Sequence, residues 1–162
     1  MNFNNIKIRQ AQLNDLKSIA EIKVTGWKSA YQGIIADKYL NSMSVSEQMD
    51  RLKSYSLETV FIAEKDNKIL GFCRIYDYDK SVYEDKEIDC EIREIYVNPN
   101  IKRMGIGSRL FHYILEYFKE KGKKNLYIGC LEDNHNARKF YEKWAEFLKR
   151  EKILKLEERS IR

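Results

Sequence analysis

The sequence predicts an α/β fold with a mixed, mainly antiparallel sheet of six or seven strands, flanked by about four helices. Short apolar runs with period-two alternation, typical of strands, alternate with longer runs in which apolar residues recur every three or four positions, typical of helices. A chain of 162 residues, 43% hydrophobic and 34% charged, has a globular composition and can bury one core. No repeat, linker or low-complexity tract interrupts it, so we expect one domain over residues 1–162.

The N-terminal half is predicted to hold a strand, two helical segments and a hairpin. Residues 13–31 carry apolar side chains at helical spacing, and Asp15 lies in the first turn, where the helix dipole favours an acid. Asp66-Asn67-Lys68 separates two strand-like runs and is typical of a hairpin turn. The predicted elements are a strand at 6–10, a helix at 13–31, a helical segment at 37–55 broken near Ser44, and strands at 60–63 and 69–76.

The C-terminal half is predicted to contain two helices and several strands. Ile106, Leu110, Ile114 and Phe118 recur every fourth residue, and Gly122 follows as a stop signal, which predicts a helix over 106–121. The other predicted elements are strands at 87–97 and 126–131, a helix at 134–144, and one or two closing strands over 147–159, with a final hairpin at 152–162.

The predicted strand at 87–97 changes phase. Its apolar side chains fall first on even positions (88, 90, 92) and then on odd ones (95, 97). Since a strand alternates faces with period two, the change indicates an extra residue, a β-bulge, near Arg93-Glu94. The alternative is a strand covered on both faces, in which phase has little meaning. A bulge would bend the strand away from its neighbour and open a cleft in the sheet.

The loop after this strand has features of a phosphate-binding site. The N–H groups in the first turn of a helix have no intrahelical partner and lie at the positive end of the dipole. Gly105 and Gly107 remove Cβ atoms that would hinder approach, while Lys102, Arg103 and Arg109 add positive charge. The loop is neither a dinucleotide fingerprint nor a Walker motif, because the third glycine and the Gly-Lys-Ser/Thr triplet are absent.

Two segments resemble motifs of the GNAT superfamily of N-acetyltransferases. Ile-Tyr-Val-Asn-Pro at 95–99 followed by Lys-Arg-Met-Gly-Ile-Gly at 102–107 resembles its coenzyme A motif, and Asn-His-Asn-Ala-Arg-Lys-Phe-Tyr-Glu-Lys at 134–143 resembles a second motif. The resemblance implies a GNAT-like sheet splayed between the fourth and fifth strands, with acetyl-CoA as co-substrate. Trp144-Ala145-Glu146 departs from the family's Leu-Gly pair, and Lys102 and Met104 depart from its loop.

The resemblance also implies which residues contact the coenzyme. The backbone of 95–97 would pair with the pantetheine arm, and the amides of 103–108 would hold the pyrophosphate. The implied set is Ile95, Tyr96, Val97, Lys102, Arg103, Met104, Gly105, Ile106, Gly107, Ser108, Asn134, Tyr141 and Lys143.

Acetyl transfer to an amine needs a base, an oxyanion donor and an acid. Asn134 and Tyr141 are seven residues apart on one predicted helix face, so both can face one cleft, and we expect Tyr141 to be the acid. The resemblance favours Glu91 over Glu94 as the base, with water as an alternative, and the N–H of Val97 as the oxyanion donor. The structural alternatives are a packed core tyrosine at 141 and solvated carboxylates on the strand.

Trp27 and Tyr31 resemble a segment that covers the acceptor site in small family members. Aromatic residues four apart on a helix also occur in cores, and that alternative stays open. The expected acceptor is a primary amine, either a small molecule or a peptide N-terminus. Two other functions are compatible with parts of the sequence: a non-catalytic acyl-CoA sensor of the same fold, and a basic nucleic-acid binder, which we do not expect because the aromatic residues fall mainly at core spacing.

Composition excludes several other classes. Cys73, Cys90 and Cys130 are odd in number and lie in strand-like runs, so we expect buried thiols, and with two histidines no metal site is expected. A nucleophilic pair of Cys130 and His135 is a minor alternative. No apolar run approaches the roughly 20 residues of a membrane span, and no signal peptide is seen, so we expect a cytoplasmic protein without membrane contact. The sequence leaves open whether it is a monomer or a homodimer.

Overall fold

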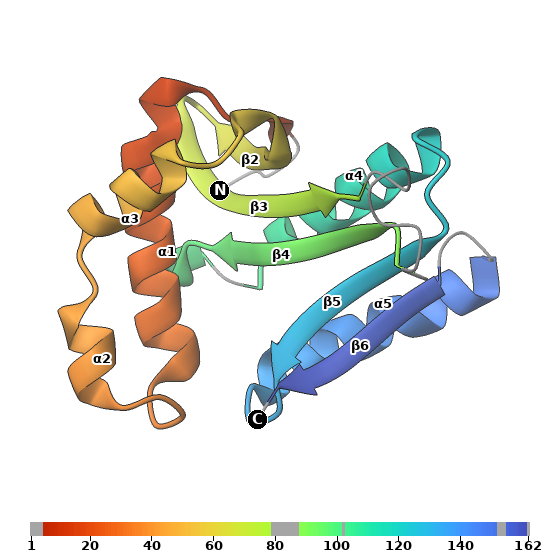
Figure 1. Ribbon diagram of the computed structural model, residues 1–162. Helices are drawn as coiled ribbons and strands as arrows, with labels where there is room; N and C mark the ends of the chain where they lie inside the picture. Colours follow the sequence, from red (N-terminus) through yellow and green to blue (C-terminus); the bar gives the residue numbers. More distant parts are fainter. Residues whose placement is uncertain (1–4, 79–87, 102, 152–154, 162) are drawn as a thin grey trace. The chain divides into compact units, whose positions relative to one another are not determined.

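The computed structural model describes residues 5–78, 88–101, 103–151 and 155–161 of the chain (Figure 1). Strands and helices alternate as the sequence predicted, and the mixed α/β fold is confirmed. The elements are β1 (Lys7–Gln10), α1 (Leu16–Tyr31), α2 (Asp37–Ser42), α3 (Val45–Lys53), β2 (Val60–Lys65), β3 (Lys68–Asp77), β4 (Cys90–Val97), α4 (Ile106–Glu120), β5 (Asn125–Leu131), α5 (His135–Glu151) and β6 (Lys155–Ile161), with short 3₁₀ turns η1 (Leu13–Asp15), η2 (Leu57–Thr59) and η3 (Pro99–Ile101).

The sheet has six strands in the order β1-β2-β3-β4-β5-β6. β1 pairs with β2, and β2 with β3, in antiparallel fashion, whereas β4–β5 and β5–β6 are parallel pairs. The predicted hairpin is confirmed: Asp66 and Asn67 both have positive φ (49° and 59°), as a tight turn between β2 and β3 requires. The predicted break near Ser44 is also present, because the Ser44 side chain accepts the Glu47 N–H at 3.1 Å and caps α3.

Two compact units make up the chain. Residues 1–74 and 94–112 form one, here called the N-terminal unit, and residues 75–93 and 113–162 form the other, the C-terminal unit. The expectation of a single domain stays a prediction.

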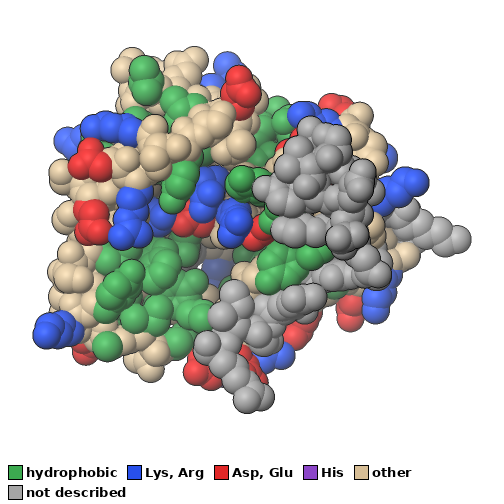
Figure 2. All heavy atoms as spheres, viewed as in Figure 1, with side chains coloured by type: hydrophobic (Ala, Val, Ile, Leu, Met, Phe, Trp, Pro, Cys, Tyr) green, Lys and Arg blue, Asp and Glu red, His purple; other side chains and the backbone are tan. Residues whose placement is uncertain are grey.

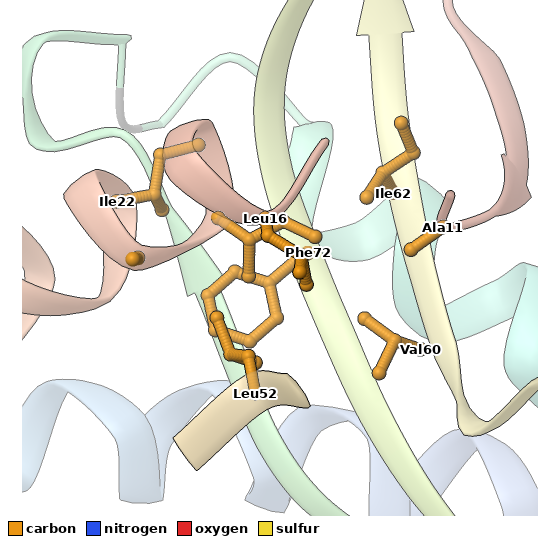
Figure 3. Packing of buried hydrophobic residues seen from close by; sticks show 9 residues of the cluster. Ala11, Leu16, Ile22, Leu52, Val60, Ile62 and Phe72 are labelled. Atoms are coloured by element: carbon orange, nitrogen blue, oxygen red, sulfur yellow. The ribbon is translucent and has the colours of Figure 1, made fainter. Parts of the chain in front are cut away.

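The core of the N-terminal unit lies where α1 and α3 pack on the hairpin. Figure 3 shows Leu16 of α1, Leu52 of α3 and Phe72 of β3 pointing toward one another. Burying a side chain of this size contributes about 1.5–3 kcal/mol. The buried cluster consists of Ala11, Leu16, Ile19, Ala20, Ile22, Leu52, Val60, Ile62 and Phe72.

The C-terminal unit is organised around β5, whose residues are alternately buried and half-buried. The carboxylate of Asp89, itself buried, accepts the N–H of Asn125 at 2.8 Å and that of Lys124 at 3.0 Å, so it fixes the entry into β5. The stop signal after α4 is confirmed. Gly122 has φ +70°, and the Lys123 N–H bonds to the Phe118 carbonyl at 3.0 Å, which closes the helix.

The predicted C-terminal end is wrong in two respects. α5 continues to Glu151 instead of stopping at 144, and a single strand, β6, replaces the final hairpin. The physical reason is the missing glycine: with Trp144-Ala145-Glu146 in place of a Leu-Gly turn, nothing favours the left-handed conformation that ends a helix, and the following residues are good helix formers. β6 then pairs with β5 in parallel.

Candidate active site

The loop between β4 and α4 turns the chain into the start of α4. Arg103 (φ 66°) and Gly105 (φ 78°) both adopt the left-handed region, and the Gly105 carbonyl accepts the first helical hydrogen bond, from the Arg109 N–H at 3.0 Å. A Cβ on Gly105 would meet no described atom within 4 Å, so glycine is needed here for its backbone angle and not for space. Lys102 lies outside the described residues.

The predicted phosphate-holding residues differ in exposure. Arg103, Met104 and Gly105 are exposed, Met104 by 43%, whereas Gly107 and Ser108 are half-buried. Ile106 is buried and anchors the first turn in the core. The first-turn N–H groups of α4 therefore begin directly after an exposed, basic and glycine-containing turn, which is the arrangement expected of an anion site.

Tyr96 and Val97, at the end of β4, lie close to two glycines that the sequence analysis did not single out. A Cβ on Gly71 of β3 would lie 2.7 Å from the Tyr96 carbonyl oxygen and 3.2 Å from the Val97 Cα. A Cβ on Gly26 of α1 would lie 2.8 Å from the Tyr96 ring. The absence of side chains at these two positions lets β3 and α1 approach the predicted pantetheine segment closely; a glycine inside a strand was the available signal.

Glu94 is bound by two cations. Its Oε1 lies 2.6 Å from Lys23 Nζ, and its Oε2 lies 3.0 Å from Arg74 Nε. The Arg74 guanidinium also lies 4.2 Å from the centre of the Tyr55 ring. Burial alone would raise the pKa of Glu94, but the charges and hydrogen bonds of Lys23 and Arg74 hold it below its usual value. A carboxylate held in this way is a weak base.

Glu91 belongs to the C-terminal unit and has different partners. It is buried; its Oε2 accepts the Tyr78 hydroxyl at 2.5 Å, and its Oε1 lies 3.3 Å from Arg93 Nε. Burial, together with the hydrogen bond to Glu91 and the charge of Glu91, raises the pKa of Tyr78 to about 12, so its hydroxyl stays protonated and donates. Sequence reasoning missed Tyr78, since no spacing rule links the end of β3 to the start of β4.

Tyr141, Asn134 and Lys143 lie on or next to α5. The Asn134 Oδ1 accepts the Ala137 N–H at 3.2 Å and caps the helix. Tyr141 is buried, and its ring packs edge-on against Phe140 with centroids 5.4 Å apart. Lys143 is exposed. The burial of Tyr141 is compatible with the packed-tyrosine alternative, so its role as the acid stays a prediction.

Trp27 and Tyr31 form an aromatic cluster with Tyr39 of α2, which the sequence analysis did not include. The Trp27 ring centre lies 4.8 Å from that of Tyr31 and 6.2 Å from that of Tyr39. Figure 2 shows hydrophobic side chains gathered over α1 and α2, and Tyr39 is 51% exposed. Within the described part of the chain, the buried Trp27 Nε1 has no hydrogen-bond partner.

The first residues of β4, the strand whose apolar positions change phase in the sequence, pair with β5 as expected. Cys90, Glu91 and Ile92 of β4 lie in parallel register with Leu126, Tyr127 and Ile128 of β5. A register shift is seen elsewhere, between β2 and β3 at Ala63/Glu64. The bulge near Arg93-Glu94 and the cleft that would follow from it stay predictions.

The remaining expectations concern thiols, metals and membranes. Cys73, Cys90 and Cys130 are buried free thiols, as predicted, and burial raises the pKa of Cys73 and of Cys90. Among the described residues, no three His, Cys, Asp or Glu side chains gather in a way that could hold a metal ion. In the same part of the chain, no helix combines the length and apolar character that crossing a membrane requires.

Comparison with known proteins agrees with this architecture. The sequence pattern of the acetyltransferase (GNAT) family matches residues 27–147. An uncharacterized N-acetyltransferase of Bacillus subtilis is 31% identical over 130 residues, which cover 80% of this chain and 73% of that protein. A spermidine N(1)-acetyltransferase of Thermoplasma acidophilum is 25% identical over 126 residues, 72% of this chain and 73% of that protein. The chain belongs to the acetyltransferase (GNAT) family and is an N-acetyltransferase.

A solved structure supports the fold. PaiA N-acetyltransferase from Thermoplasma acidophilum, crystallised with coenzyme A, superposes with a TM-score of 0.70 at 22% identity, over 86% of this chain and 87% of that one. At this identity the likeness establishes the fold alone.

Proposed function

We propose that this protein transfers an acetyl group from acetyl-CoA to a primary amine by direct attack within a ternary complex. The observation that carries the proposal is the turn at Arg103–Gly105, which leads an exposed basic loop into the first turn of α4. In the proposal, the amides of 103–108 hold the pyrophosphate. The backbone of 95–97, which lies close to Gly71 at Tyr96 and Val97, pairs with the pantetheine arm.

The chemistry needs three groups of this chain. Glu91 accepts a proton from the attacking amine as the new C–N bond forms at the thioester carbonyl. The Val97 N–H donates to the oxyanion, and the Tyr141 hydroxyl gives its proton to the sulfur as the C–S bond breaks. Glu91 is preferred over Glu94 because Lys23 and Arg74 already neutralise Glu94, whereas Glu91 retains lone pairs beyond those used by Tyr78 and Arg93.

One observation favours a second candidate, a non-catalytic acyl-CoA sensor. Both candidate bases already have charged or hydroxyl partners, an arrangement that binding without turnover would tolerate. Both functions need the loop at 103–108, and only the enzyme needs Glu91 and Tyr141. The acceptor of the enzyme is a small-molecule or peptide amine, and the cytoplasmic location stays a prediction.

The coenzyme site is tested by Gly107→Val. The added β-branched side chain, placed in the first turn of α4, should block the approach of the pyrophosphate and abolish coenzyme A binding in calorimetry. Glu120→Val, at an exposed position near the other end of α4, is the matched control and should bind like the wild type. Unchanged affinity of a folded Gly107→Val protein would remove the loop as the binding site.

A further inference from the structure

The N-terminal unit contains a buried cluster of charge that is not balanced. Lys23 and Arg74 share one carboxylate, that of Glu94, at 2.6 Å and 3.0 Å. The side chains of Lys23, Arg74 and Glu94 are 8%, 14% and 13% exposed, so the cluster is largely removed from water. Within the described residues, neither cation has another acid as a partner. Two positive charges and one negative charge leave this cluster with a net charge of +1.

An uncompensated buried cation is unfavourable, because no opposite charge offsets the hydration free energy that it loses. The two cations also have unused hydrogen-bonding capacity. A lysine ammonium has three donors and a guanidinium has five, yet among the described residues each binds Glu94 through one nitrogen. The Arg74 guanidinium also packs against the face of the Tyr55 ring, and this contact fixes the plane of the guanidinium. One added anion would neutralise the cluster and use these donors.

The cluster lies beside both predicted substrate segments of the N-terminal unit. Lys23 is one helical turn before Trp27 on α1, so the two share a face. Glu94 directly precedes the segment at 95–97 on β4. Figure 2 shows Lys and Arg side chains gathered over α1 and the adjoining parts of β3 and β4, next to the hydrophobic side chains over α1 and α2. A ligand there could place an apolar part on the aromatic cluster and an anion on the cations.

We propose that Lys23 and Arg74 bind a carboxylate of the acceptor, which makes the acceptor an amine that also carries a carboxylate. The inference rests on the proposed acetyl transfer and names its substrate class. The Arg74 fork suits bidentate binding of a carboxylate, and the Trp27–Tyr31–Tyr39 cluster suits an apolar or aromatic body. Polycationic amines such as spermidine would be repelled by the excess positive charge.

The test compares amines of equal basicity with and without a carboxylate, such as 4-(aminomethyl)benzoate with benzylamine, in a series of such pairs with different spacing. Charge-assisted hydrogen bonds predict that the wild type favours the carboxylate member of at least one pair by about 10- to 100-fold in kcat/KM. Lys23→Met leaves a neutral pair of Arg74 and Glu94 and fills the space of the lysine stem, so it should fold. It should lose the preference, mainly through a higher KM.

Two further variants make the test specific. Lys28→Met removes an exposed lysine from the same helix and should keep the preference. Arg74→Gln, which leaves Lys23 and Glu94 as a neutral pair, should lose it as Lys23→Met does. Coenzyme A affinity, measured by calorimetry, should stay within about twofold of the wild type in Lys23→Met, because the carboxylate belongs to the acceptor.

Three results overturn the proposal. The wild type could use both members of every pair equally, or the preference could survive in Lys23→Met. Lys23→Met could also lose coenzyme A affinity, which would assign the anion to the coenzyme. Each of these results differs from failure of the proposed acetyl transfer. If acetyl transfer fails, no amine releases thiol, and Gly107→Val leaves coenzyme binding unchanged.

Discussion

Glu91 and Glu94 lie three residues apart on β4, and the structure gives their carboxylates different surroundings. Glu94 is bound to Lys23 and Arg74, which lower its pKa. Glu91 accepts a hydrogen bond from a tyrosine that stays protonated to about pH 12. Period-two alternation could mark both residues as strand carboxylates. Their partners could not be predicted, because Lys23 and Arg74 are remote from Glu94 in sequence.

Glu94→Gln should be strongly destabilising. It leaves Lys23 and Arg74 buried without an anion, and breaking a buried ion pair costs about 3–5 kcal/mol. Urea unfolding should show the loss at neutral pH, while Glu58→Gln, at an exposed site, should change little. A loss below about 1 kcal/mol would mean that the cluster is solvated in solution.

The ion pairs of Glu94 with Lys23 and Arg74 also predict that the stability of the protein depends on pH. The pKa of Glu94 is lower in the folded protein than in the unfolded chain, so its contribution to stability is complete above the unfolded value of about 4.3. It is lost as the pH falls through the lower folded value. The stability difference between the wild type and Glu94→Gln should therefore narrow in that acidic range and stay constant from pH 6 to 8. A constant difference down to about pH 2 would contradict the assignment.

Tyr141→Phe tests the acid. The hydroxyl should act on the departing sulfur and not on the bound ground state, so turnover should fall by about 10²–10⁴-fold while coenzyme A affinity is kept. Tyr113→Phe, an exposed tyrosine on α4, is the control and should leave turnover unchanged. Turnover within about twofold of the wild type, with chemistry rate-limiting, would assign Tyr141 to packing against Phe140.

At the scale of elements, the ends of helices and hairpins depend on local chemistry, and the sequence predicted them where that chemistry is present. The turn at Asp66-Asn67, the Ser44 cap and the stop at Gly122 are all found. The predicted end of α5 at 144 was wrong, because Trp144-Ala145-Glu146 contains no glycine that would end the helix, and α5 continues to Glu151. The approach of β3 and α1 to Tyr96 depends on tertiary packing, so Gly71 and Gly26 could not be assigned a role from spacing alone.

Gly71→Ala tests whether the close contact between β3 and the predicted pantetheine segment at 95–97 positions that segment. The new Cβ would lie 2.7 Å from a backbone oxygen of Tyr96, which cannot rotate away, so β4 must shift. Overpacking of this kind costs about 1–3 kcal/mol, and coenzyme A affinity should fall with it. Lys68→Ala, at an exposed position on the same strand, should change neither quantity. A Gly71→Ala protein with wild-type stability and affinity would show that β4 is not held at this point.

At the scale of the whole molecule, composition and element order predicted an α/β fold, and the resemblance of two segments to family motifs indicated an acetyltransferase. Family membership agrees with both. The motif at 102–107 and the motif at 134–143 carry that information because each combines backbone and side-chain requirements at fixed spacing. The N-terminal unit contains the loop, the aromatic cluster and Glu94, whereas Glu91, Asn134 and Tyr141 belong to the C-terminal unit. No sequence pattern alone identifies the acceptor amine.

The central claim is transfer of an acetyl group, and amine-dependent release of free coenzyme A thiol tests it most directly. Purified protein is incubated with acetyl-CoA and a panel of amines that includes carboxylate-bearing, neutral and polycationic members. The products are identified by mass spectrometry. We predict thiol release that requires an amine, matched by one N-acetylated product per thiol, and absent in Gly107→Val. Tight coenzyme binding without thiol release across the panel would contradict acetyl transfer and favour the sensor.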